Sequence, residues 1–157
     1  MCPRCGGPVD VALRYHSRVK TLLVDNDRDL LQRCVARVGG RQQLLVAVSK
    51  AQSLQLLQHH PQIEAIVACE QLADGSGLAL LDEVHARWPQ LIPIFCAERH
   101  RLALLRHRLS ALRLRYTLTY PIRSAKLELL LLRVAHARAA STIRIRAPMR
   151  SKLTSQR

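Results

Sequence analysis

Four polar or thiol side chains stand at the ends of short apolar runs in this sequence. Asp25 and Asn26 follow one such run, and Cys69 and Cys96 each close another. Carboxylate and amide oxygens suit a hard cation such as Mg²⁺, whereas thiols favour soft metals and redox chemistry. These residue types are therefore compatible with a metal site or a reactive thiol pair, and also with thiols that are simply buried and inert.

The apolar runs predict the strands that would position these side chains. Runs of about five to seven residues alternate with longer stretches of helical period, which is typical of repeated βα units in a parallel sheet. The strands are expected at Val19–Val24, Leu44–Val48, Ile63–Cys69, Leu91–Cys96 and Leu114–Leu118.

A helix is expected after each strand. Asp27 or Asp29 can cap the first helix, which stops at a Gly-Gly pair, and the second spans about Lys50–His59. The third begins near Ser76 and ends before Pro89, because proline disfavours helical backbone at the residue before it.

The last two helices carry features that bear on binding. The fourth places Leu102, Leu105 and Leu109 on one face and arginines on the other, which predicts one amphipathic helix with a basic outer side. The last helix runs from after Pro121 to about Ala140 and has two apolar stripes. One contains Leu127, Leu130, Leu131 and Val134, and the other, free for a partner or covered by a neighbouring helix, contains Leu129 and Leu132.

Two stretches resemble a known family. The run IVACEQLADGSGL, together with LLVDND, resembles the two acidic-site strands of bacterial response-regulator receiver domains. In that family a strand ends on the phosphoacceptor aspartate and a glycine opens the next helix eight residues later; counting back eight from Gly77 leads to Cys69. The resemblance covers residues 19–140. It implies an α/β, flavodoxin-like fold, with a doubly wound five-stranded parallel sheet of order 2-1-3-4-5 and helices on both faces.

The sequence departs from the receiver pattern at four strand ends. An amide replaces the second acid of the metal-binding pair, a thiol replaces the phosphoacceptor, Ala97 or Glu98 falls where a hydroxyl is usual, and tyrosine replaces the lysine before Pro121. Phosphoryl transfer depends on positioning, metal and cationic charge. We expect no cofactor, no Mg²⁺ held by Asp25, no aspartyl phosphorylation, and a degenerate pocket formed by Asp25, Asn26, Cys69, Glu98 and Tyr120.

Glu70 and the two thiols of Cys69 and Cys96 each allow more than one interpretation. Glu70 could mimic a phosphorylated aspartate, but side chains alternate along a strand, so we expect it to point away from the pocket that Cys69 faces. Cys69 and Cys96 would lie near the same end of neighbouring strands, either inert or as a thiol switch.

Positive charge is concentrated at one end of the chain. The net charge is +14, and residues 98–157 hold fifteen basic and two acidic side chains. Such a block attracts nucleic acid or acidic protein surfaces in a salt-sensitive way. In receivers the fourth helix, fifth strand and fifth helix bind partners or a second subunit. We expect the partner-binding face here to include Arg99, Arg101, Arg106, Arg108, Arg113, Arg115 and Arg123.

These observations favour a degenerate receiver of two-component, phosphorelay-type signalling, located in the bacterial cytoplasm. It would not be an enzyme, and would bind a signalling protein or a second copy through its basic face without phosphorylation. Weak binding of nucleic acid or other anions by the basic block, and an atypical receiver or thiol switch that uses Cys69, remain alternatives. The few aromatic residues, one Trp, one Phe and three Tyr, argue against a base-stacking platform.

The two ends of the chain differ from the rest. Residues 1–18 show no sustained period and residues 141–157 are basic, which predicts flexible tails. Cys2 and Cys5 resemble half of a zinc site, but a structural zinc needs four ligands and no second close pair is present.

Overall fold

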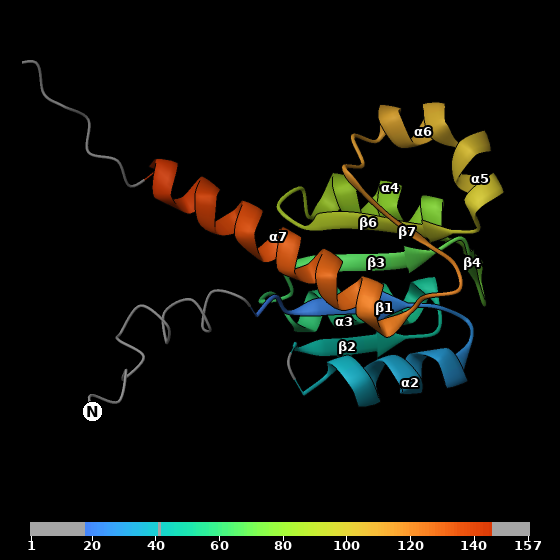
Figure 1. Cartoon of the computed structure of the whole chain (residues 1–157). Coiled ribbons are helices and arrows are strands. Elements are labelled where there is room, and N and C mark those ends of the chain that lie inside the picture. Colours follow the sequence, from blue (N-terminus) through green and yellow to red (C-terminus); the bar gives the residue numbers. More distant parts are fainter. Residues whose placement is uncertain (1–17, 41, 146–157) are drawn as a thin grey trace, which may run out of the picture.

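A five-stranded parallel sheet forms the centre of the molecule (Figure 1). The computed structural model describes residues 18–40 and 42–145. Hydrogen-bonded neighbours follow the order β2-β1-β3-β6-β7, so the predicted doubly wound order 2-1-3-4-5 is confirmed. The strands are β1 (Thr21–Val24), β2 (Leu44–Ala47), β3 (Ala65–Cys69), β6 (Ile92–Ala97) and β7 (Tyr116–Thr119).

Helices cover both faces of this sheet. One apolar cluster joins one face to α2 and α7, and a second joins the other face to α3, α4 and α6. Both faces are covered, so β1 and β3 are buried along their whole length and are nearly all apolar rather than alternating, as is usual for parallel sheets. The helices are α2 (Arg28–Val38), α3 (Lys50–His59), α4 (Gly77–Arg87), α5 (Arg99–Leu104), α6 (Arg106–Ala111) and α7 (Ser124–Ile145).

The basic fourth helix of the prediction is two short helices. α5 and α6 meet at Leu105, whose backbone leaves the helical range (φ −90°, ψ 3°). Leu102, Leu105 and Leu109 all contact the apolar cluster on the α4 side, as the apolar period predicted. The single continuous helix was wrong because the leucine period continues through the bend.

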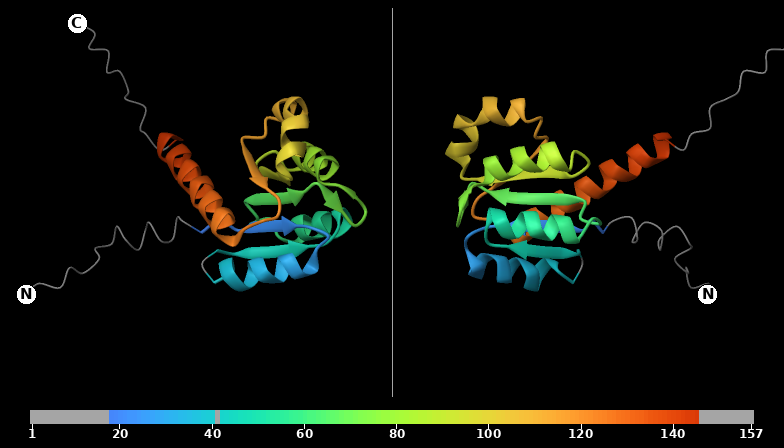
Figure 2. Two further views of the ribbon diagram at one scale, coloured as in Figure 1. Left: turned by 45° about the vertical axis from the view of Figure 1, so that its right-hand side comes forward. Right: turned by 180° about the vertical axis from the view of Figure 1, so that it is seen from behind.

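Helix α7 is longer than predicted and only partly covered. Its main stripe, including Leu127 and Leu131, is buried, whereas Leu129 in the second stripe is 63% exposed. The helix reaches Ile145, so residues 141–145 of the predicted tail are helical, and it projects past the amino ends of the strands (Figure 2). Residues 1–17 and 146–157, with Cys2 and Cys5, lie outside the described residues.

The loop after β3 explains the eight-residue spacing from Cys69 to Gly77. A small hairpin of β4 (Gln71–Leu72) and β5 (Gly75–Ser76) returns the chain beneath the strand end, and a Cβ at Gly77 would collide with the carbonyl oxygen of Cys69. At the hairpin turn, Asp74 accepts hydrogen bonds from the first backbone N–H groups of α3, at 2.6 Å from Lys50 and 3.0 Å from Ala51. The loop from Cys69 to Gly77 therefore has a structural role at this edge of the sheet, which does not require phosphate chemistry.

No helix within the described part of the chain is both long and apolar enough to cross a membrane.

Candidate functional site

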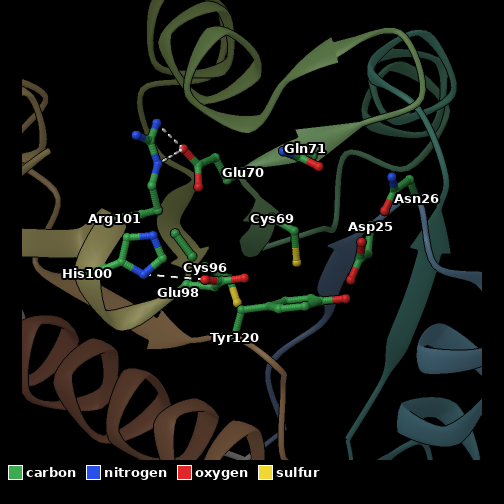
Figure 3. A pocket seen from close by; sticks show the side chains of 11 residues that line it. Asp25, Asn26, Cys69, Glu70, Gln71, Cys96, Glu98, His100, Arg101 and Tyr120 are labelled. Atoms are coloured by element: carbon green, nitrogen blue, oxygen red, sulfur yellow. Dashed lines mark hydrogen bonds and ion pairs between the residues drawn. The ribbon is translucent and has the colours of Figure 1, made fainter. Parts of the chain in front are cut away.

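The carboxyl ends of β1, β3, β6 and β7 surround a cavity of about 270 Å³ (Figure 3). Because parallel strands all end at this edge, side chains far apart in the sequence meet there. All five residues of the predicted pocket line the cavity: Asp25, Asn26, Cys69, Glu98 and Tyr120.

Asp25 is the buried acid of this pocket. It follows β1 and is 1% exposed. Its Oδ1 accepts a hydrogen bond from the backbone N–H of Asp27 at 3.3 Å, but its Oδ2 has no hydrogen-bond partner within the described residues. Burial raises the pKa of Asp25 above its ordinary value, although hydrogen bonds from the Asp27 N–H and the Cys69 thiol oppose the rise.

Cys69 and Cys96 form a buried thiol pair beside Asp25. They are register partners on β3 and β6, exposed 2% and 0% respectively. The hydrogen bond between the two thiols and their burial raise the pKa of Cys69, and the Asp25 carboxyl adds to this effect. Because the thiolate is the reactive form of cysteine, this environment favours the inert interpretation over the thiol switch.

Tyr120 closes the pocket from the β7 side. Its ring lies across the cavity with the hydroxyl end towards Asp25 (Figure 3). Burial raises the pKa of Tyr120, and the carboxylates of Asp25 and Asp27 raise it further. A neutral phenol thus occupies the position before Pro121, where the receiver pattern has a lysine cation.

Glu70 and Arg101 form an ion pair at the receiver pocket. Glu70 lines the same cavity as Cys69, so the expectation that it points away was wrong: the chain bends after β3 ends, and strand alternation no longer applies. Its Oε1 accepts from Arg101 Nη2 at 2.6 Å and from Nε at 2.7 Å. Arg101, predicted on the partner-binding face, is held at the pocket by this ion pair, which raises the pKa of its guanidinium.

The remaining wall residues were only partly foreseen. His100 Nδ1 lies 3.3 Å from Glu98 Oε2 at the rim, and Gln71 enters from the β4–β5 hairpin. Sequence reasoning did not assign these two residues to the pocket, because neither belongs to the receiver pattern. The sequence signal that could have found them is their closeness along the chain to predicted pocket residues: His100 to Glu98, and Gln71 to Cys69.

Comparison with solved structures identifies the architecture. The receiver domain of an HD domain-containing protein from Pseudomonas fluorescens Pf-5 matches with a TM-score of 0.67 and 26% identity, over 82% of this chain and 93% of that one. A response regulator receiver domain from Clostridium thermocellum matches with a TM-score of 0.68 and 17% identity, over 79% of this chain and 98% of that one. A CheY-like receiver domain from Methanospirillum hungatei JF-1 matches with a TM-score of 0.66 and 15% identity, over 79% of this chain and 97% of that one.

The chain has the response-regulator receiver fold. No family model and no curated protein sequence matches it. The receiver fold places Cys69 at the end of the third strand of the sheet, so the site position that the sequence resemblance indicated is also its position in space.

The receiver pocket of this chain does not fit Mg²⁺. A hard divalent cation requires several oxygen ligands, usually with more than one carboxylate. Asp25 and the exposed Asn26 amide supply oxygen, but Cys69 supplies a protonated thiol. Within residues 18–40 and 42–145, no cluster of three or more His, Cys, Asp or Glu side chains is placed to hold a metal ion.

The predicted basic face lies mainly at the β7 side of the receiver fold. Arg99 is on α5, and Arg106 and Arg108 are on α6; all three are exposed and form no ion pair with another described residue. Arg113 and Arg115 lie between α6 and β7, and Arg123 just precedes α7, also exposed.

Proposed function

We propose that this chain is a degenerate receiver of two-component signalling that acts by binding a protein partner, without accepting a phosphoryl group. The observation that carries the proposal is the buried, protonated thiol at the phosphoacceptor position, Cys69. A thiol there cannot form the acyl phosphate that the receiver switch uses, and Tyr120 offers no cation to neutralise one.

Internal pairing of the pocket supports a fixed rather than switched state. Glu70 is paired with Arg101, which links the loop after β3 to α5. Glu98 is paired with His100 on the same side. The acidic side chains at the rim of the cavity therefore have partners within the chain, whereas the buried Asp25 is the acid whose Oδ2 has none among the described residues.

The basic face indicates the chemistry of the partner. We define its α5–α6 part by Arg99, Arg106 and Arg108, which are exposed and lack ion pairs within the described residues. Guanidinium groups form bidentate hydrogen bonds with carboxylates. An acidic protein surface fits this face better than a second copy of the same face, because like charges would oppose each other.

A charge-reversal experiment tests the binding role. The variant Arg99→Glu, Arg106→Glu, Arg108→Glu should lose partners that the wild-type chain retains from a native lysate, and added salt should weaken the wild-type retention. A matched control reverses three exposed arginines of α2: Arg28, Arg33 and Arg37. Identical partners for both variants and the wild type would contradict the proposal.

A second measurement tests independence from phosphorylation. The wild-type chain is incubated with acetyl phosphate and Mg²⁺, and its intact mass is recorded. We expect no phosphoryl increment, because the pocket lacks the nucleophilic carboxylate and the compensating cation. A stoichiometric increment abolished by Asp25→Asn would overturn this part of the proposal.

Binding of nucleic acid is a second candidate, which the unpaired arginines of α5 and α6 also favour. Removing residues 146–157, which leaves α7 as described, should then lower the affinity for random DNA at low salt. This candidate would be favoured over the protein-binding function if the chain still binds DNA at physiological salt and retains no protein partner from the lysate.

A further inference from the structure

A second cavity, of about 490 Å³, lies at the opposite end of the sheet from the receiver pocket. The end of α4, the start of β6, the segment between α6 and β7, and the projecting part of α7 border it; Figure 2 shows how α7 extends past the strands at this end. We call it the amino-end cleft, defined by Pro89, Pro93, Arg113, Arg115, Tyr116 and Arg138.

Cationic side chains dominate the polar lining of the amino-end cleft. Three guanidinium groups and His85 line it, and no carboxylate is among its lining residues. Arg138 is engaged, because its Nη1 lies 2.9 Å from Glu64 Oε1. Arg113 and Arg115 are exposed and form no ion pair with another described residue, so their charges are available to an anionic ligand.

Arg113 occupies an unusual backbone conformation in this cleft. Its φ is +54°, within the left-handed region where glycine normally ends a helix. The helix-ending hydrogen bonds are present: the Arg113 N–H donates to the Ser110 carbonyl and the Leu114 N–H to the Leu109 carbonyl, both at 3.0 Å. A glycine would satisfy the same turn without strain, and residues in such conformations cluster at functional sites.

Residues around Arg113 give the cleft both apolar and charged walls. Leu112 and Leu114 contact the core on the α4 side, whereas Arg113 and Arg115 are exposed and line the cleft. Pro89 and Pro93 add apolar surface, and Tyr116 adds an aromatic ring. The cleft thus offers apolar contact beside guanidinium groups.

We propose that the amino-end cleft binds a small phosphorylated organic molecule of about nucleotide size. A volume of about 490 Å³ lies within the range of roughly 300–1,000 Å³ that small-molecule sites occupy. Guanidinium forks bind phosphate oxygens in bidentate fashion, and the apolar walls contact the organic part. Elements from both faces of the sheet border the cleft, and its volume matches a small ligand. This site is separate from the receiver pocket and does not depend on the protein-binding function.

Isothermal titration with ADP, pyrophosphate and adenosine tests the proposal at about 0.15 M salt, where non-specific attraction between exposed charges is screened. ADP should bind saturably, pyrophosphate more weakly and adenosine not measurably. The variant Arg113→Glu, Arg115→Glu should weaken ADP binding by about tenfold or more, because two cations become anions at the ligand. Circular dichroism verifies that the variant is folded.

A control separates the cleft from overall charge. Arg99→Glu, Arg108→Glu makes the same change in net charge outside the cleft and should leave ADP affinity within about twofold of wild type. Equal losses in the two variants would overturn the proposal, as would the absence of saturable binding by both ADP and pyrophosphate. A short single-stranded oligonucleotide that binds through Arg113 and Arg115 while ADP does not would overturn it in favour of nucleic acid.

Discussion

Charged side chains are arranged differently at the two ends of the central sheet. At the carboxyl end, Glu70 is paired with Arg101 and Glu98 with His100, while the thiols of Cys69 and Cys96 are buried. At the amino end, arginines line a cleft that has no carboxylate among its lining residues. Charges that satisfy each other stabilise one arrangement, whereas charges without partners attract a ligand. This difference is the basis of the two proposals that place binding away from the receiver pocket.

Restoring an acid to the receiver pocket should produce the largest effect. Cys69→Asp places a second carboxylate beside the buried Asp25, without the cation that a lysine at position 120 would provide. We expect the free energy of unfolding at pH 7 to fall by about 3 kcal/mol, because two like charges share a poorly solvated site. Urea denaturation measures this loss.

Two controls sharpen the Cys69→Asp experiment. Cys69→Ser keeps the side chain small and neutral, and should cost only about 1 kcal/mol. Excess Mg²⁺ should recover part of the stability of Cys69→Asp and none in the wild type, since only the variant has two carboxylates for the ion. An aspartate variant as stable as the wild type would show that the pocket is still built for a second acid, and would break the comparison.

Removing the existing acid should have the next largest effect, with the opposite sign. Burial raises the pKa of Asp25 in the folded state above its ordinary value of 3.8, so the charged carboxylate at pH 7 opposes folding. That penalty is absent below pH 3.8, where both states are protonated, and develops as the pH rises through the folded pKa. Asp25→Asn should therefore increase the free energy of unfolding at pH 7 by about 1–2 kcal/mol.

Measuring the Asp25→Asn difference across pH tests its cause. The advantage of the variant should shrink towards zero as the pH falls to about 3.8. Asp29→Asn is a suitable control, because Asp29 is exposed on α2. An advantage that stays constant between pH 7 and pH 4 would mean that the buried charge of Asp25 is not what destabilises the pocket.

The contrast between the two ends was only half visible in the sequence. Apolar runs predicted the five strands, and the resemblance to receivers implied their order; the strand ends then brought Asp25, Cys69 and Tyr120 together. Local signals of this kind work because burial of both sheet faces leaves a continuous apolar pattern. The degenerate pocket was therefore predictable from three short motifs.

Contacts between distant segments were not predictable in this way. Arg101 was assigned to the basic face because its neighbours are arginines, yet it pairs with Glu70, 31 residues earlier. The break at Leu105 leaves no mark on the leucine period, and the amino-end cleft combines four segments that no motif connects. Sequence reveals the density of arginine, but only the fold shows which arginines face a cavity.

A smaller effect on stability is expected at Arg113 of the amino-end cleft, where the backbone has a positive φ. Arg113→Gly allows the positive φ without a side-chain clash, so the free energy of unfolding should rise by up to about 1 kcal/mol. The same substitution removes a guanidinium from the cleft and should weaken ADP binding severalfold. Arg37→Gly in the exposed last turn of α2 is the control, which should lose stability and leave ADP binding unchanged. Stability gained with no loss of affinity would mean that Arg113 serves no ligand.

The smallest global effect is expected for the ion pair that spans the receiver pocket. Arg101→Gln removes the pairing with Glu70, but the side chains of Arg101 and Glu70 are 43% and 22% exposed, so the thermal midpoint should barely change. Amide exchange should nevertheless become faster in α5 and at Glu70, because the link between the two segments is lost. His100→Gln, which removes the more exposed pairing with Glu98, should leave exchange at Glu70 unchanged. Unaltered exchange in Arg101→Gln would show that α5 is held by its leucines alone, and that the charges of the receiver pocket are as free to act as those of the amino-end cleft.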